Sequence, residues 1–367
     1  MSTAVPSTGV PSTGVPSAGV PSAGVDPLLV ETVERLLEEE STFDAVEQAE
    51  TDGWCAPVWD ALEASGFPWI SLAEDVGGSG GSLADAMAVL RSVGRHAAPV
   101  PLAETGVLGG WLAAGAGFEL PSGPTTVVPD SRALTLDGGR LRGEATVAWA
   151  RPAARVLAVV DAPDGPLIVS APPDQLDIEP RTNLAGEPRD VVRFDHALAD
   201  LEHAPAASGV DGDALLQRGC LTRIVLSAGA LETLTQLTVD YTNERRQFGK
   251  PVAAFQAVQL HLVTIAQASV RASMAADLAT RALAAGDARF EIAAARVVVD
   301  AAAVEATRAS HQAHGAMGVT REYRLHHFSR RLWAWRHEYG AAKHWRRALG
   351  TDIAAAGADE LFPTISR

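Results

Sequence analysis

The sequence predicts a mainly α-helical protein with a central β-domain, an α+β fold class. Three observations support this prediction. Residues 26–120 place apolar side chains at helical spacing, residues 121–205 change to short β-branched segments, and residues 206–350 return to long alanine-rich helical segments. This order separates a helical N-terminal domain, a small β-domain and a C-terminal helical bundle.

The charge and composition of the chain argue against several classes of protein, including nucleic-acid-binding and membrane-spanning proteins. The chain has 367 residues, enough to bury a large core, and a formal charge of −15, which opposes binding to nucleic acid. No apolar run approaches the ~20 residues of a membrane span, and no signal peptide precedes the first helical segment. The two cysteines, Cys55 and Cys220, are far apart and predict free thiols in a reducing cytoplasm rather than a disulfide scaffold.

The N-terminal part divides into a repeat and a helical domain. Residues 1–25 repeat VPSTG or VPSAG, and we expect them to form a disordered tail because they offer no large side chain to bury. Asp26 is placed to cap the first helix. A further helix is predicted over residues 45–64, and Ser82 is placed to cap the helix that follows a glycine-rich loop.

The β-domain and the bundle follow in turn. Within residues 121–205, the DAPDG sequence at residues 161–165 predicts a hairpin turn. The segments at 221–244, 255–285 and 290–315 are long, contain few helix breakers and are apolar on more than one stripe, which predicts a bundle buried partly against a second subunit, in a homo- or hetero-oligomer. Residues 351–367 are predicted to be a C-terminal tail.

Two segments carry the most specific patterns. Residues 244–259 read ERRQFGKPVAAFQAVQ, in which an arginine at a turn between two helices is suited to a diphosphate across an interface. Residues 312–323 read QAHGAMGVTREY, in which small residues after a glutamine let the backbone approach a ligand closely.

These segments and the domain order resemble the acyl-CoA dehydrogenase family over nearly the whole chain outside the repeat. The resemblance implies a helical N-terminal domain, a β-barrel, a C-terminal four-helix bundle and FAD as the cofactor. It implies that Arg245 contacts the FAD pyrophosphate of a neighbouring subunit, that Phe248 packs near the adenine and that Gln256 contacts the same cofactor. Gln312 and Ala316 are implied to approach the pyrophosphate and adenosine across the dimer.

The family chemistry needs one glutamate, which removes the α-proton of an acyl-CoA thioester while hydride passes to the flavin. In the family it commonly stands in a Y-E-G-T segment. The corresponding stretch here is WRHEYGAA, residues 335–342, where an ungapped count places the catalytic position on Tyr339. Glu338, one residue earlier, is the predicted base. The position that other members use, on a bundle helix, falls on Gly219 or Thr222, and neither is an acid.

The resemblance thus predicts an FAD-dependent acyl-CoA dehydrogenase, an oxidoreductase of fatty acid or lipid metabolism that forms a 2,3-enoyl-CoA and passes electrons to an electron-transfer flavoprotein. One alternative is a non-catalytic or half-catalytic subunit of a heteromeric acyl-CoA dehydrogenase. It is favoured by the displaced Glu338 and by the absence of the T-E-P-x-A-G-S-D run typical of the family's β-domain. The other alternative is a flavin monooxygenase of the same fold. Trp149 is predicted to be a core residue, with stacking near the flavin as the alternative.

No metal site is predicted from the sequence. Four histidines lie close together, but no carboxylate or cysteine accompanies them at a spacing typical of zinc ligands. These histidines are His311, His314, His326 and His327.

Overall fold

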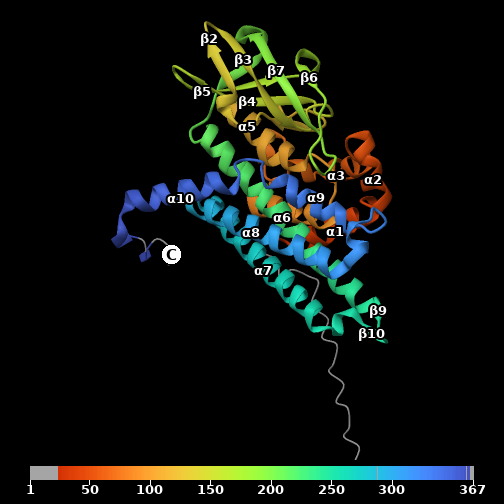
Figure 1. The fold of residues 1–367 in the computed structure, drawn as a ribbon. Helices are drawn as coiled ribbons and strands as arrows, with labels where there is room; N and C mark the ends of the chain where they lie inside the picture. The colour runs from red at the N-terminus through yellow and green to blue at the C-terminus, as the bar shows by residue number, and fades with distance from the viewer. Residues whose placement is uncertain (1–23, 287, 361, 364–367) are drawn as a thin grey trace, which may run out of the picture.

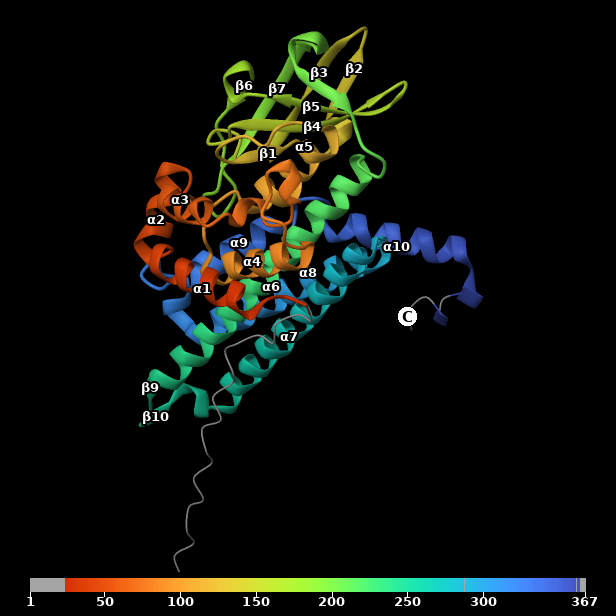
Figure 2. The ribbon, with the colours of Figure 1, turned by 180° about the vertical axis from the view of Figure 1, so that it is seen from behind.

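The computed structural model describes residues 24–286, 288–360 and 362–363, so most of the predicted repeat tail lies outside the described residues. The β-domain sits at one end of the helical body, as Figures 1 and 2 show from opposite sides. The mainly helical fold with a central β-domain is confirmed. The helices are α1 (Pro27–Glu40), α2 (Phe43–Asp52), α3 (Ala56–Ala64), α4 (Leu83–His96), α5 (Trp111–Ala116), α6 (Gly212–Glu244), α7 (Gln256–Ala285), α8 (Arg289–His314), α9 (Leu325–Trp335) and α10 (Ala342–Ala356).

Side-chain caps begin several helices of the N-terminal domain. The Asp26 side chain accepts a hydrogen bond from the Leu28 amide at the start of α1, and Ser82 forms a capping box with Asp85 at the start of α4. The prediction of one helix over residues 45–64 is wrong, because Gly53 adopts a φ of 89° and ends α2. Helix α4 packs against α6 and joins this domain to the bundle.

The β-domain consists of two four-stranded sheets that share one apolar core. The sheet orders are β1-β4-β5-β8 and β2-β3-β7-β6, and only the β1–β4 pair is parallel among these strands. The hairpin predicted from DAPDG is confirmed, since Ala162 pairs with Gly165 at the β4–β5 turn. The strands are β1 (Thr125–Val127), β2 (Leu134–Asp137), β3 (Arg140–Ala148), β4 (Arg155–Ala162), β5 (Gly165–Ala171), β6 (Asp177–Glu179), β7 (Arg189–Ala197) and β8 (Glu202–Pro205).

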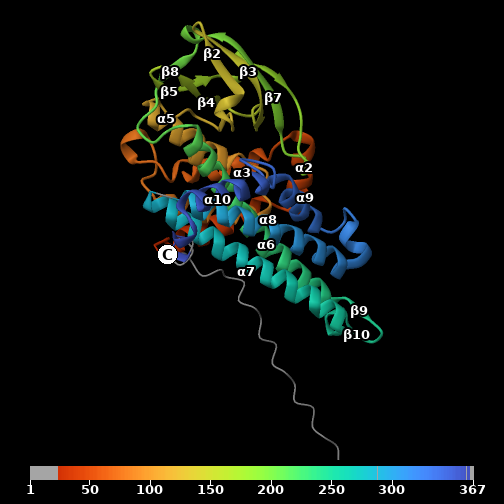
Figure 3. The ribbon, with the colours of Figure 1, turned by 60° about the vertical axis from the view of Figure 1, so that its left-hand side comes forward.

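The C-terminal bundle is built on three long helices that run side by side (Figure 3). Helices α6, α7 and α8 pack on one another, while α9 contacts α6 and α10 contacts α8. A short hairpin of β9 (Arg246–Gln247) and β10 (Lys250–Pro251) connects α6 to α7 and lies at the end of the bundle away from the β-domain (Figure 1). Helix α10 continues to Ala356, past the predicted start of the tail at residue 351. No helix of the described residues is long and apolar enough to cross a membrane.

Candidate functional site

The predicted base, Glu338, lies just after α9, and both of its carboxylate oxygens accept hydrogen bonds from arginines. Nε of Arg189 lies 2.8 Å from Oε1, and Nε of Arg223 lies 2.6 Å from Oε2. Burial opposes ionisation of Glu338, but the charges and hydrogen bonds of the two guanidinium groups outweigh it. They lower the pKa of Glu338 from 4.5 to about 2. The carboxylate is therefore held ionised with both oxygens occupied.

These contacts belong to a larger group of buried charges. Arg223 also pairs with Glu104 of the N-terminal domain, and Glu187, just before β7, pairs with Arg189 at 3.1 Å and with Arg331 of α9 at 3.0 Å. We call the six residues Glu104, Glu187, Arg189, Arg223, Arg331 and Glu338 the central charge cluster. It contains three carboxylates and three guanidiniums, and it joins all three domains in the interior of the molecule.

Tyr339 fills the position that the ungapped count assigns to the base. Its side chain is buried and its φ is 49°, a conformation that a residue other than glycine seldom adopts. The ring packs directly on Gly219, where an added Cβ would lie 2.1 Å from the tyrosine Cδ1. Tyr339 and Gly219, which is one of the two predicted alternative positions for the family's carboxylate beside Thr222, thus lie in contact, and neither carries an acid. Burial raises the pKa of the Tyr339 phenol far above its usual range, so the ring stays neutral.

The space beside the central charge cluster is too small for a flavin. The cavity there has a volume of about 20 Å³, enough for about one water molecule, whereas ligand pockets span roughly 300–1,000 Å³. Trp149 lines it at 3% exposure, with the Arg189 guanidinium 5.7 Å from its ring centre. Trp149 is therefore a buried residue, as predicted, and the side chains around it do not fit an isoalloxazine ring in this conformation.

The five candidate cofactor-binding residues lie elsewhere, at the free end of the bundle. Arg245, Phe248 and Gln256 surround the β9–β10 hairpin, and Gln312 and Ala316 lie where α8 ends; all five are exposed. We call these five residues the bundle tip.

Two contacts join the segments that form the bundle tip. The Tyr241 hydroxyl donates to the His314 carbonyl oxygen at 3.3 Å, and the Tyr241 and His314 rings stack with centres 4.4 Å apart. Tyr241 lies one helical turn before the hairpin, and His314 is the last residue of α8. The structure thus brings the two sequence motifs together and places both away from Glu338.

The bundle tip carries side chains of the kinds that can hold a dinucleotide. Within the described residues Arg245 forms no ion pair with a carboxylate, so its guanidinium is available to an external anion. Phe248 is 91% exposed, and its ring lies edge-on to that of Phe255, with centres 6.1 Å apart. A guanidinium can pair with a pyrophosphate and an aromatic ring can pack on a base, and the β9–β10 hairpin lies at the end of the bundle away from the β-domain (Figure 1).

The sequence reasoning missed most of the central charge cluster. Its members are distant in sequence, and Glu104 and Arg223 are 119 positions apart. One local signal of a buried ion pair was present in the sequence. Arg223 stands in a mostly apolar stretch of α6 that includes Leu221 and Ile224. An arginine in such a stretch must find a buried carboxylate, since an unpaired buried charge is too costly.

Comparison with known proteins gives consistent matches. The family model "Acyl-CoA dehydrogenase, N-terminal domain" matches residues 26–117, and "Acyl-CoA dehydrogenase, C-terminal domain" matches residues 214–362. Acyl-CoA dehydrogenase FadE28 of Mycobacterium tuberculosis is 30% identical over 293 residues, which are 74% of this chain and 84% of FadE28. Acyl-CoA dehydrogenase FadE34 of the same organism is 28% identical over 84% of this chain, which spans only 45% of FadE34.

Among solved structures, the ChsE4–ChsE5 complex from Mycobacterium tuberculosis contains a chain of the same fold. The TM-score is 0.82 at 20% identity, and the match covers 93% of this chain and 100% of that one.

Proposed function

The chain belongs to the acyl-CoA dehydrogenase family, and we propose that it is the subunit of a heteromeric, FAD-dependent acyl-CoA dehydrogenase that does not supply the catalytic base. In this proposal a second, similar chain carries the glutamate and the acyl-CoA site. The present chain completes that partner's FAD site with its bundle tip. Electrons from the assembled enzyme pass to an electron-transfer flavoprotein.

The state of Glu338 is the observation that carries the proposal. A base that removes an α-proton must reach the substrate and have a pKa not far below neutral. Glu338 has both oxygens bonded to arginines and a pKa of about 2. Such a carboxylate is a poor proton acceptor, and its removal would leave Arg189 and Arg223 with fewer partners in the interior. We infer that Glu338 is a structural anion.

The bundle tip supplies the positive part of the proposal. Bound FAD would provide the hydride acceptor, as it does in the family. Arg245 would bind its pyrophosphate, Phe248 would pack against the adenine, and Gln256, Gln312 and the small side chain of Ala316 would complete the contact. These residues are exposed, and they belong to the end of the bundle that lies away from the chain's own β-domain, which suits a cofactor held by a partner.

Two of the similar proteins support a paired assembly. The solved structure of ChsE4–ChsE5 is described as a complex of two named proteins. FadE34 is more than twice as long as the part that matches this chain, which leaves room for a second domain set of the same size. Both fit a family branch in which two units of this kind work together, either as two chains or within one longer chain.

A second candidate function is the self-sufficient dehydrogenase with Glu338 as its base. It is favoured by the position of Glu338, which is the acid next to the expected catalytic position and precedes Gly340, the match to the family's glycine. This function would require Arg189 and Arg223 to release the carboxylate and the cavity beside Trp149 to widen when FAD and substrate bind.

The test is to purify the tagged full-length chain from its source cells and to measure bound FAD in the complex that it forms with a similar chain. The proposal expects a yellow heteromer, and Arg245→Ala in this chain should lower FAD retention at least about tenfold, since a charge-assisted contact of about 1.5–3 kcal/mol is lost. The matched control is Arg281→Ala, an exposed arginine on α7, which should retain FAD. Equal FAD content in wild type and Arg245→Ala would overturn the assignment of the bundle tip.

A further inference from the structure

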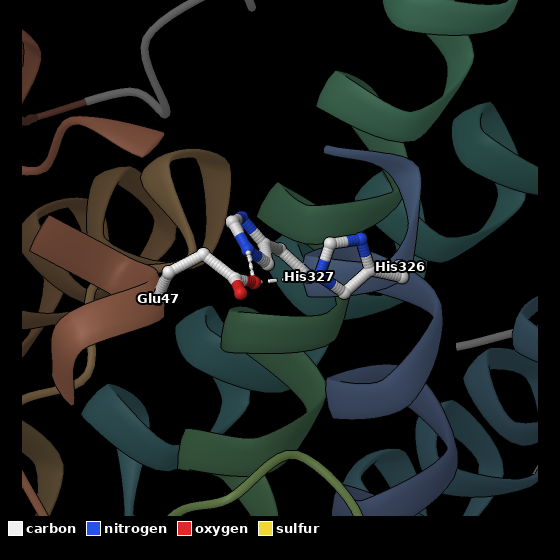
Figure 4. A group of neighbouring side chains, drawn as sticks. All are labelled: Glu47, His326 and His327. Atoms are coloured by element: carbon white, nitrogen blue, oxygen red, sulfur yellow. Dashed lines mark hydrogen bonds and ion pairs between the residues drawn. The ribbon is translucent and has the colours of Figure 1, made fainter. Parts of the chain in front are cut away.

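Glu47, His326 and His327 meet between the N-terminal domain and the bundle (Figure 4). Glu47 lies on α2, and the two histidines are adjacent on α9. Glu47 and His327 are 280 positions apart in the sequence. Oε1 of Glu47 lies 2.8 Å from Nε2 of His326 and 2.7 Å from Nε2 of His327. The fold thus supplies the carboxylate that the local sequence around the histidines lacks.

The single N–H of a neutral His326 does not account for both of its contacts. Its Nδ1 lies 3.0 Å from the Tyr323 carbonyl oxygen, which can only accept, so Nδ1 carries the hydrogen. In a neutral imidazole the other nitrogen then has a lone pair, and this lone pair faces a carboxylate oxygen at 2.8 Å. Two lone pairs at that distance require a shared cation, either a proton on the line between the atoms or a metal ion beside that line, at about 2.0–2.2 Å from each atom.

The arrangement also has the outer contacts of a metal site. A histidine that binds a metal through Nε2 usually donates its Nδ1–H to a carbonyl or carboxylate, which fixes the ring. His326 has this contact, and Phe43 packs on both rings, with centres 6.4 Å from His326 and 5.0 Å from His327. The three donor atoms lie within 4.8 Å of one another, so a modest separation would admit an ion.

We propose that Glu47, His326 and His327 bind one divalent transition-metal ion, with Zn²⁺ as the best-matched ion. Two imidazole nitrogens and one carboxylate oxygen are a ligand set that Zn²⁺ accepts in tetrahedral sites, with water as the fourth ligand. Access to the site is through Glu47, whose side chain is 24% exposed, while His327 is buried.

The guanidinium groups around this point are each paired with a carboxylate, including the buried Arg331, whose charge acts on His327 and which pairs with Glu187 at 3.0 Å. Arg321 pairs with the other Glu47 oxygen, Oε2, at 2.8 Å, so it does not compete with the histidines for Oε1, and its side chain is 70% exposed and can turn toward solvent. Glu50, one turn further along α2, pairs with Arg330 at 2.5 Å. The ion would therefore connect α2 to α9 beside an existing ion pair, and it would hold the N-terminal domain against the bundle.

The test is titration of ZnCl₂ into the untagged, chelator-treated full-length chain by calorimetry. We expect one ion per chain. His327→Gln and Glu47→Gln, which keep polar side chains of similar size, should each weaken binding by more than about tenfold, because even the loss of an outer contact costs about ten- to hundredfold. His203→Gln is the matched control, since His203 is exposed and its Nδ1 also faces a carbonyl oxygen, and it should bind Zn²⁺ like wild type.

A second measurement uses only the wild-type chain, so its result does not depend on whether the variants fold. The wild-type chain loaded with Co²⁺ should give the visible absorption of a tetrahedral site, and Zn²⁺ should raise its melting temperature. The proposal is overturned if wild type binds Zn²⁺ no more tightly than the two cluster variants. It is equally overturned if wild type shows neither the Co²⁺ spectrum nor the thermal shift, which would leave a shared proton as the cation between His326 and Glu47.

Discussion

The central charge cluster and the bundle tip both depend on arginines of the α6 region, and those arginines are in opposite states. Arg223 is 1% exposed and bonded to two carboxylates, whereas Arg245, roughly 30 Å further along the helix, is exposed and forms no ion pair within the described residues. The first arginine has its partners inside the chain, and the second has its charge available to a ligand. The comparison separates buried arginines that are paired within the chain from an exposed arginine that we propose binds FAD.

The largest expected effect is the loss of Arg223. Arg223→Met would leave Glu104 and Glu338 with one fewer buried cation, and we expect it to lower the free energy of unfolding by about 3–5 kcal/mol. Denaturant unfolding at fixed protein concentration measures this. Arg271→Met is the matched control, because it breaks an exposed ion pair with Glu305 and should cost no more than about 1 kcal/mol. Similar costs for the two variants would contradict the distinction between interior and exterior.

The second effect is the pH dependence of the free energy of unfolding that Glu338 causes. Its pKa falls from 4.5 in the unfolded chain to about 2 in the folded one, so its ion pairs stabilise the fold fully above about pH 4.5 and are lost as the pH falls toward 2. The stability difference between wild type and Glu338→Gln should be constant from pH 5 to 8 and shrink by on the order of 3 kcal/mol below that range. A difference that titrates near neutral pH would instead identify a proton-accepting base.

A smaller effect should follow from adding one carbon atom beside Tyr339. Gly219→Ala would place a Cβ against the buried ring, and we expect a cost of about 1–3 kcal/mol from overpacking. Tyr339→Gly removes the ring and adopts the positive φ easily, so the cost of Gly219→Ala should largely disappear in that background. Gly350→Ala on α10, where nothing lies near the added atom, should be neutral or stabilising. Equal costs in both backgrounds would mean that the two positions do not touch.

The smallest expected effect concerns the stability of the bundle tip. Phe248 is 91% exposed, so Phe248→Ala should change the free energy of unfolding by no more than about 0.5 kcal/mol in the isolated chain. The same variant should lose FAD from the heteromer. Thermal unfolding and flavin absorbance measure the two quantities on one preparation. A strongly destabilised Phe248→Ala chain would show that the ring supports the fold rather than a ligand.

The sequence predicted the features that depend on local pattern. Helical spacing identified the long bundle helices, β-branched segments identified the β-domain, and the DAPDG turn located the β4–β5 hairpin. The break at Gly53 was missed, because a glycine in a helical pattern signals an end only when its backbone conformation is known.

Pairings between distant residues could not be predicted. Nothing near Glu338 in the sequence indicates Arg189 or Arg223, which are 149 and 115 positions away. Nothing near His327 indicates Glu47. Such contacts depend on how helices and sheets pack, and local periodicity carries no information about that. The two segments of the bundle tip could be identified because each is continuous in the sequence, and their role in binding FAD stays a prediction.

The most direct test is the visible spectrum of the purified wild-type chain, recorded alone and during titration with acyl-CoA thioesters. The account predicts that the isolated chain retains little or no flavin and that no thioester bleaches it, whereas the heteromer with a similar, glutamate-bearing chain is yellow and bleaches. An isolated chain that is yellow and bleaches with an acyl-CoA, and that loses bleaching but not flavin on Glu338→Gln, would contradict it and assign the base to Glu338.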